Sequence, residues 1–378
     1  MKDHPALKTL SELVAINSVN PAYANGRKEE AIQRYILDFF KAAGFPTETQ
    51  EALPGRPNVI AKLAGRDPSR RLILEAHVDT VGIDDMTISP FEPVLRDGLL
   101  YGRGACDAKG GLAAMMHALI EAREICDQPP CDVWLAATVD EEFSYRGALN
   151  LCEGLSATGA IIAEPTSLRL VIASKGCLRS RITVNGQAAH SSKPHLGVNA
   201  ITRMARVLAA LEEEEGRLNE KLHPLVGAPT LNVGIIRGGA QVNIVPNECS
   251  IEVDRRIVPG ETVIEVQARY DQLFDGLRRE IPDLKISQYR ILEDWPMETA
   301  ANAHIVQIAS AALQYVNLNS KPTGVPFGSD ASKLSRIGIP SIVFGPGSID
   351  QAHTADEFVP VDEVIIATQI YKEIIRNF

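Results

Sequence analysis

The stretch Leu72-Ile-Leu-Glu-Ala-His-Val-Asp-Thr-Val81 is the part of the sequence on which the fold prediction depends most. Its alternation predicts a buried strand with four apolar side chains on one face. His77 and Asp79 would then share the opposite face at the end of that strand. A neutral imidazole can bind a metal ion, and a neighbouring carboxylate can orient the ring. Taken alone, such a pair is more often ordinary packing, so the prediction rests on what the other strands carry.

Asp107 lies in a second unusual stretch, Gly102-Arg-Gly-Ala-Cys-Asp-Ala-Lys-Gly-Gly111, which leads into a helix expected over residues 108–125. The glycines alone could cradle a phosphate group, but their spacing is neither GxGxxG nor that of a P-loop. A loop of small residues would also let the Asp107 carboxylate bridge two metal ions with little steric obstruction. The stretch therefore makes Asp107 a candidate metal ligand.

Two adjacent glutamates follow an apolar strand expected over residues 133–139. Glu141 and Glu142 come directly after Asp140, and three neighbouring carboxylates repel one another. The carboxyl ends of strands are also where ligands bind in open α/β sheets. The triplet is therefore either a solvated loop or a place where a divalent cation offsets the repulsion. In the second case one glutamate binds the metal and its neighbour faces the metal-bound water.

Two more candidate ligands lie after apolar segments. Glu164 follows a short strand expected over residues 160–163, and His353 comes after the apolar segment 341–344. Several strands thus end in a group that can bind a metal ion. A set of histidine and carboxylate ligands without cysteine suits zinc, cobalt or manganese in a hydrolytic site.

The composition is that of a globular protein, with 45% hydrophobic and 23% charged residues in a chain of 378. The net charge of −10 argues against nucleic acid as a partner, because phosphate binding needs a basic face. No stretch reaches the roughly 20 apolar residues of a membrane span, so we expect no membrane partner, and residues 1–10 lack the apolar core of a secretory signal. The six cysteines, Cys126 among them, show no CxxC spacing, so we expect reduced thiols and a cytoplasmic protein.

Apolar periodicity predicts an α/β chain whose pattern changes twice. In the first part, strands alternate with helices, which favours a largely parallel sheet covered on both faces. Near residue 174 this gives way to half-exposed strands and two helices, and the α/β pattern returns after residue 292. We therefore expect a metal-binding catalytic domain over residues 1–174 and 293–378, with a small α+β domain over 175–292 inserted into it. The strands expected in the inserted domain are 178–184, 230–236, 241–245, 248–255 and 285–292.

Together these motifs resemble the signature of the di-zinc metallopeptidase and amidohydrolase family that includes acetylornithine deacetylase, succinyl-diaminopimelate desuccinylase, aminoacylase and glutamate carboxypeptidase. The resemblance runs over nearly the whole chain in order. It implies a phosphorylase/hydrolase-like catalytic domain with a mixed sheet flanked by helices. It also implies that the inserted domain is a two-layer, ferredoxin-like lid that forms a homodimer. The motifs are His77-Val-Asp79, Gly104-Ala-Cys-Asp-Ala-Lys-Gly-Gly111, Glu141-Glu142, Ala163-Glu-Pro165 and His353.

The resemblance also implies two Zn2+ ions, or Co2+ or Mn2+ in their place. Asp79 would orient the first histidine ligand. Glu141 would be the general base that takes a proton from the activated water and returns it to the leaving amine. A cis peptide bond would follow the bridging aspartate. The implied ligands are His77 and Glu164 for one ion, Glu142 and His353 for the other, and Asp107 between the two.

Four further residues match positions that meet the substrate in this family. His190 alone would be a surface or capping histidine, but the resemblance implies that it reaches the partner subunit's site and stabilises the oxyanion. Asn243 alone would be read as a polar residue on the surface of a strand, and Arg255 likewise. The resemblance, however, matches both residues to positions that bind the substrate carboxylate. The planar guanidinium of an arginine is suited to that contact. Ser329 lies in Gly328-Ser-Asp-Ala331, which departs from the family's Gly-Thr-Asp-Ala loop, and would contact substrate.

The leading hypothesis is a hydrolase that removes the acyl group from an N-acyl amino acid, of the acetylornithine deacetylase type. A dipeptidase or carboxypeptidase would use the same chemistry, as would a succinyl-diaminopimelate desuccinylase, so these alternatives stay open. A non-catalytic homologue is disfavoured because every metal and base position is filled. An acidic structural domain without metal is the remaining alternative.

Overall fold

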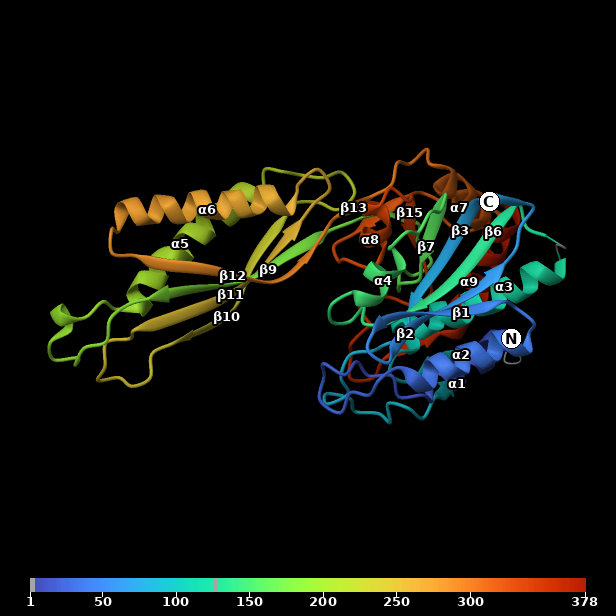
Figure 1. The fold of residues 1–378 in the computed structure, drawn as a ribbon, viewed down its shortest axis with the longest axis horizontal. Helices are drawn as coiled ribbons and strands as arrows, with labels where there is room; N and C mark the ends of the chain where they lie inside the picture. Colours follow the sequence, from blue (N-terminus) through green and yellow to red (C-terminus); the bar gives the residue numbers. More distant parts are fainter. Residues whose placement is uncertain (1–3, 126–127) are drawn as a thin grey trace. The chain divides into compact units, whose positions relative to one another are not determined.

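The computed structural model describes residues 4–125 and 128–378 of the chain. The chain divides into two compact units, which are described separately here (Figure 1). Unit 1 comprises Met1–Ile172, Glu298–Thr323 and Ser329–Phe378, and unit 2 comprises Ala173–Met297 and Gly324–Gly328. The return of the short segment 324–328 to unit 2 was not expected from the sequence. The division into a catalytic domain and a lid or dimerisation domain stays a prediction.

Unit 1 is a mixed sheet flanked by helices, as the fold prediction required. Within the described residues its helices are α1 (Pro5–Val14), α2 (Glu30–Ala42), α3 (Gly110–Ile125), α4 (Arg146–Leu151), α7 (His304–Tyr315), α8 (Ala331–Arg336) and α9 (Val361–Asn377). The strands of its main sheet are β1 (Thr47–Leu53), β2 (Arg56–Leu63), β3 (Asp67–His77), β6 (Cys131–Thr138), β7 (Gly159–Ile162), β8 (Val171–Ser174), β13 (Met297–Glu298), β14 (Thr323–Val325) and β15 (Ser341–Val343). A small separate sheet contains β4 (Val94–Arg96), β5 (Leu99–Tyr101) and β16 (Phe358–Pro360).

The main sheet is parallel only in its centre. Its order is β1-β2-β6-β3-β7-β15-β8-β13, with β14 beside β8. The pairs β6–β3, β3–β7 and β7–β15 are parallel, whereas β1–β2, β2–β6 and β15–β8 are antiparallel. The expectation of a largely parallel sheet was therefore wrong at the edges. The polar edge strand Thr47–Leu53 lacks the apolar run by which the buried strands were recognised.

Strand β3 lies in the centre of the sheet and is buried from Leu72 to His77 on both faces. A strand between two parallel neighbours has helices on both sides, so its apolar run carries no solvent-facing alternation. Helix α3 contacts β3 and β6 and packs against α1 and α9, while α8 contacts β7 and β15. In a smaller cluster, Leu151 of α4 packs with Ile60 and Ala136. These layers fix the strand ends that carry the candidate ligands.

Unit 2 is a two-layer α+β unit with the ferredoxin-like order βαββαβ. Its described elements are β9 (Gly176–Asn185), the 3₁₀ turn η2 (Pro194–Leu196), α5 (Ala200–Leu218), β10 (Thr230–Gly238), β11 (Glu248–Ile257), α6 (Val263–Glu280) and β12 (Lys285–Asp294). The sheet is antiparallel in the order β10-β11-β9-β12. Helices α5 and α6 contribute Met204, Leu211 and Phe274 to one core with the strands. Asn199 caps α5, and a Thr262–Glu265 capping box begins α6.

The strand expected over residues 241–245 is not present. Residues 242 and 243 form a turn, and the segment makes only an isolated bridge between Ile244 and His190. Its alternating letters resemble a strand, but the side chain of Val242 is fully exposed, so no core selects that alternation. The segment is instead a loop between β10 and β11.

No helix among residues 4–125 and 128–378 is long and apolar enough to cross a membrane. The structure shows free thiols at Cys106, Cys131, Cys152, Cys177 and Cys249. Cys126, which the sequence analysis also took as a reduced thiol, lies outside the described residues. A cytoplasmic location stays a prediction.

We predict that Ile251→Ala destabilises unit 2 by about 2–5 kcal/mol, because Ile251 is fully buried in its core and the cavity cannot close completely. Hydrogen exchange of the β9–β12 amides, followed by mass spectrometry, measures the effect. Ile235→Ala in the same sheet is the control, since Ile235 is 39% exposed and should cost under about 0.5 kcal/mol. Equal losses in the two variants would contradict this account of the core.

Candidate metal centre

The carboxyl ends of the parallel strands bring the candidate ligands to one edge of the main sheet. Strand β3 ends at His77, β6 ends just before Asp140, and β7 ends just before Glu164. Strand β15 runs parallel to β7, and the loop that follows it leads to His353. Side chains that are far apart in the sequence therefore meet where open α/β sheets bind their ligands.

Two sets of three donor residues lie at this edge, and the sets share one residue. Within each set, one donor atom from each residue lies within 4.8 Å of the others. All five residues that the sequence analysis named as metal ligands belong to these sets. The first set is His77, Asp107 and Glu164, and the second is Asp107, Glu142 and His353.

The Asp107 carboxylate lies between the two histidines. Its Oδ1 is 2.9 Å from Nε2 of His77, and its Oδ2 is 3.4 Å from Nε2 of His353. The same Nε2 of His353 is 3.2 Å from Oε1 of Glu142. One oxygen of Asp107 thus faces each set, which is the arrangement of a bridging ligand. His77 is buried, whereas the side chain of His353 is 49% exposed, so solvent reaches the second set.

The loop that presents Asp107 is held by the buried carboxylate of Glu357. Its Oε1 accepts the backbone N–H groups of Cys106 and Asp107, at 2.9 and 3.1 Å. Its Oε2 accepts the backbone N–H of Gly104 and a guanidinium N–H of Arg103. The loop contains a cis peptide bond between Asp107 and Ala108, as the resemblance implied. Glu357 belongs to the Asp356–Glu357 pair that matches the family resemblance, but its role in holding the loop could not be predicted, because nothing in the local sequence pattern indicates burial.

In the metal-free protein the histidines compensate the acidic groups. Burial lowers the pKa of His77, but hydrogen bonding to Asp107 and the nearby carboxylates outweigh this and raise it well above its usual value. Burial also lowers the pKa of His353, yet its contacts with Asp107 and Glu142 outweigh this and raise the pKa to about 11. Burial alone would raise the pKa of Asp107. Its hydrogen bonds to the two histidines outweigh this effect and hold the pKa below its usual range. Two imidazolium groups thus supply the positive charge that this carboxylate needs.

The three glutamates of the centre have raised pKa values, for which burial is the largest cause. Asp107 and Glu141 add to the effect at Glu164. Asp107 also raises the pKa of Glu142, against the lowering effect of His353. At Glu141, burial raises the pKa to about 8, with His77 lowering it and Glu142 raising it. The carboxylates therefore outnumber the available positive charges, and divalent cations fit this donor set.

Asp79 contacts the centre in a different way from that expected. Nδ1 of His77 lies 3.0 Å from the backbone oxygen of Asp79 and 3.8 Å from its carboxylate. The carboxylate instead accepts the backbone N–H groups of Glu141 and Glu142, at 3.1 and 3.2 Å. The backbone of Asp79 thus orients the imidazole, and its side chain holds the turn with the two glutamates.

His190 and Asn243 lie on neighbouring loops of unit 2. The backbone N–H of Ser191 donates to the backbone oxygen of Asn243, and His190 pairs with Ile244. Both predicted residues are exposed, and Nδ1 of His190 is 2.7 Å from Oγ of Ser192. The structure therefore brings these two candidates together on one surface of unit 2.

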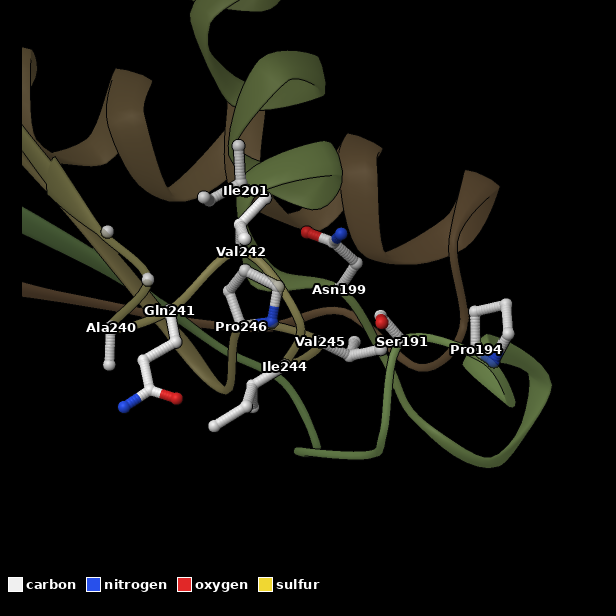
Figure 2. A pocket seen from close by; sticks show the side chains of 12 residues that line it. Ser191, Pro194, Asn199, Ile201, Ala240, Gln241, Val242, Ile244, Val245 and Pro246 are labelled. Atoms are coloured by element: carbon white, nitrogen blue, oxygen red, sulfur yellow. The ribbon is translucent and has the colours of Figure 1, made fainter.

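The same loops line an open pocket of about 600 Å³ together with Gly238 at the end of β10 (Figure 2). Pro194, Ile201 and Pro246 supply apolar surface to it, and Val242 and Ile244 on the second loop are exposed. Ser191, Asn199 and Gln241 add polar groups, so the lining is mixed, next to the polar side chains of His190 and Asn243. Exposed apolar side chains such as Val242 and Ile244 suit contact with a protein surface.

Arg255 has a different place from the one that the sequence analysis assumed. It is 4% exposed, and its Nη2 donates to both carboxylate oxygens of Glu261, at 2.9 and 3.1 Å. Alternate residues of β11 are buried, so Arg255 shares the helix-covered face with Val253 and Ile257. The side chain of the next residue, Arg256, lies on the other face and is 28% exposed. An intramolecular carboxylate thus already binds the guanidinium of Arg255.

Ser329 is buried at the start of α8. Its Oγ accepts the backbone N–H of Ala331, and its backbone oxygen accepts the hydroxyl of Ser332 and Nζ of Lys333. These are contacts that organise a helix start. The predicted substrate contact of Ser329 is not visible in them. The neighbouring Asp330 is fully buried, and burial together with Glu141 raises its pKa to about 8.

Residues 73–377 match the sequence model of peptidase family M20/M25/M40. A curated relative named acetylornithine deacetylase, from Myxococcus xanthus, is 32% identical over 385 aligned positions, which cover 99% of this chain and 98% of the relative. The chain therefore belongs to peptidase family M20/M25/M40, a family of metal-dependent hydrolases. The family resemblance drawn from the motifs is confirmed.

Solved structures support the same fold. A tripeptidase from Staphylococcus aureus has a TM-score of 0.81 at 24% identity, covering 98% of this chain and 97% of its own. A Bacillus subtilis protein described as a dinuclear metal-binding peptidase of the M20 family has a TM-score of 0.74 at 14% identity, covering 99% and 98%. At these identities the comparison shows the fold alone.

We predict that the chelator-treated protein loses stability as the pH rises from about 5 to about 8. The pKa of Glu141 is raised from 4.5 to about 8 and that of His353 from 6.5 to about 11, so the folded state binds protons more tightly than the unfolded chain. Stability from these groups is complete below their usual pKa values and is lost as the pH approaches the folded ones. The Tm should fall by roughly 2–4 °C for each kcal/mol lost.

Thermal unfolding at several pH values, with and without Zn2+, measures this effect. The zinc-loaded protein is the control and should show a flatter curve, because metal binding displaces the same protons. A chelated protein that becomes more stable between pH 5 and pH 8 would contradict the assignment of these groups to one charge cluster.

Proposed function

We propose that this protein is a metal-dependent amidohydrolase that removes the acyl group from an N-acyl amino acid, in the manner of an acetylornithine deacetylase. The observation that carries the proposal is the sharing of Asp107 between two donor sets, with Glu141 beside the ligand Glu142. The name of the Myxococcus xanthus relative, which aligns over the full chain, supports the substrate class.

The donor atoms fit two zinc ions, with cobalt or manganese as chemically similar substitutes. His77, Asp107 and Glu164 would hold one ion, and Asp107 would share the second with Glu142 and His353. When bound, such ions polarise an amide carbonyl and lower the pKa of a water molecule. The backbone oxygen of Asp79 would keep Nε2 of His77 directed at the first ion, since it contacts Nδ1.

Glu141 would move the protons. Its carboxylate would take a proton from the attacking water and deliver it to the nitrogen of the leaving amine as the amide bond breaks. Asp79 accepts the backbone N–H of Glu141, which fixes the turn from which the side chain projects. A pKa near the working pH favours both transfers, and a positioned base of this kind typically contributes ~10²–10⁴ in rate.

The loops of unit 2 would complete the site of a second subunit. We propose a homodimer through unit 2, in which His190 stabilises the oxyanion formed from the amide carbonyl and Asn243 binds the substrate. The exposed apolar side chains of Val242, Ile244 and Ile201 beside these residues support a protein contact at this surface.

Arg256 replaces Arg255 as the proposed partner of the substrate carboxylate. Both oxygens of Glu261 already bind Arg255, and breaking a buried ion pair to bind substrate would be costly. Arg256 lies on the accessible face of the same strand and contacts Asp254 at 2.8 Å. Its guanidinium has the planar fork that binds a carboxylate through two N–H groups.

We predict that Glu141→Gln keeps its zinc content but loses ~10²–10⁴ in kcat, because the amide keeps the shape of the side chain and cannot accept the proton. Hydrolysis is measured on N-acetyl and N-succinyl amino acids and on dipeptides, with metal analysis of the same samples. Glu153→Gln, which changes an exposed glutamate, is the control. Full activity in Glu141→Gln would remove Glu141 from the base role, and hydrolysis of dipeptides alone would favour a peptidase, the class of the Staphylococcus aureus structure.

We predict opposite effects at the two neighbouring arginines. Arg256→Ala should lower kcat/KM by about 10–100-fold for substrates with a free carboxylate, the cost of one charged hydrogen-bonding partner. It should not affect carboxamide analogues of those substrates. Arg255→Ala should lower the Tm without raising KM, because it removes the guanidinium that binds both oxygens of the half-buried Glu261 and leaves it only the longer contact with Lys221, at 3.7 Å. A rise of KM confined to Arg255→Ala would restore the original assignment.

A further inference from the structure

Asn20 lies next to the candidate centre. Its observed side-chain hydrogen bonds go to residues that are not among the proposed metal ligands. It is fully buried in the loop between α1 and α2. Its amide nitrogen donates one hydrogen to Oδ2 of Asp79, at 2.7 Å, and the other to Oδ1 of Asp140, at 3.0 Å. Its amide oxygen accepts the backbone N–H of Ala22 at 3.0 Å, which fixes the orientation of the amide.

The two carboxylates that Asn20 joins flank the turn with the catalytic glutamates. Asp140 directly precedes Glu141, and the carboxylate of Asp79 accepts the backbone N–H groups of Glu141 and Glu142. Asp140 itself has a positive φ of 69°, a backbone conformation that needs support from its surroundings. The side chain of Asn20 therefore holds the two carboxylates that fix the start of this turn.

A third contact places the same loop against the turn. The phenolic hydroxyl of Tyr23 donates to the backbone oxygen of Glu142 at 3.0 Å. The backbone N–H of Asn20 donates to Thr80, and that of Thr80 donates to Ser18. The loop is thus attached both to the segment that follows His77 and to the turn that contains Glu142.

The guanidinium of Arg56 offsets part of the negative charge of this network. Nη2 of Arg56 is 3.0 Å from Oδ1 of Asp140, and its guanidinium also binds both carboxylate oxygens of Glu29, which is fully buried. A neutral amide with two hydrogens can join Asp79 and Asp140 without adding charge. An aspartate at position 20 would instead put a third carboxylate between them.

Resting on the proposed function, we propose that Asn20 is a positioning residue for Glu141 and Glu142. Its amide group holds the carboxylates of Asp79 and Asp140 on either side of the turn, so that the base and its neighbouring metal ligand keep their places. A displacement of about 1 Å in such a site can cost ~10² in rate. The loop between α1 and α2 thus contributes to the chemistry although it supplies no metal ligand.

The test uses Asn20→Asp, which keeps the shape of the side chain, and Asn20→Ala, which removes the donor without adding charge. Thr9→Val is the matched control, because it removes a buried hydrogen bond, 2.8 Å between Thr9 and His117, in the packing of α1 against α3. Each purified protein is assayed for kcat and KM on the hydrolysis panel, for Tm, and for Zn2+ affinity by calorimetric titration of the metal-free form.

The expected result is a loss of about 10²-fold in kcat at unchanged KM in both Asn20 variants. The second equivalent of Zn2+ should bind about 10–100-fold more weakly, because Glu142 is a ligand only of the second set. Thr9→Val should lower the Tm and leave kcat and both zinc affinities unchanged.

Asn20 variants that lose Tm as Thr9→Val does, yet keep kcat and both zinc affinities, would overturn the proposal. Failure of both Asn20 variants to fold would do the same, since it would make the residue structural. Wild-type protein that hydrolyses no substrate on the panel would refute the proposed function instead. The zinc titration would then decide the role of Asn20 by itself.

Discussion

The concentration of carboxylates at one edge of the main sheet is the constraint on which the rest of unit 1 depends. Asp107, Glu142 and Glu164 lie close together with Glu141 beside them, and burial raises the pKa of each of the three glutamates. Ionised groups of like charge cannot be kept together in a buried site unless positive charge is brought to them. In the metal-free protein, the imidazolium groups of His77 and His353 supply it, and in the proposed holoenzyme two divalent cations would take over that role.

A further set of carboxylates fixes the loops at this edge, although none of them is a proposed metal ligand. Glu357 accepts three backbone N–H groups of the loop that presents Asp107. Asp79 accepts those of Glu141 and Glu142, and Asp140 is held by Asn20 and Arg56. Backbone N–H groups and neutral amides stabilise these anions without competing for the cations. The ligand positions therefore depend on side chains from α1–α2, from β2 and from the loop before β16, all remote in the sequence.

Four of the five candidate ligands could be placed at one edge from the sequence because they end or follow apolar segments, and segments of this kind become the central parallel strands. His77, Glu142 and Glu164 are examples, and neighbouring parallel strands bring their ends together whatever their separation in the chain. Asp107 is the exception, since its signal was a loop of small residues before a helix. The residues that hold the ligands could not be found in this way. Glu357 and Asn20 lie in segments without periodicity, and their burial follows from tertiary packing alone. The polar edge strand β1 was not predicted for a related reason, since an edge strand need not be apolar on both faces.

In unit 2 the strand β11 was predicted correctly, but the functional arginine on it was assigned one residue away from the one that the structure favours. The strand expected over residues 248–255 is present as β11, but side chains alternate between its faces, so adjacent arginines have opposite surroundings. Arg255 points to the helices and is neutralised by Glu261, whereas Arg256 stays on the accessible face. The buried pair contributes to the packing of β11 against the start of α6, and the alternate side chains of the strand stay accessible. Both arginines of β11 already have a carboxylate partner, so the cost of exchanging that partner for a substrate distinguishes them. The pair of Arg255 with Glu261 is largely buried, whereas the pair of Arg256 with Asp254 is open to water, and this difference favours Arg256 as the proposed substrate ligand.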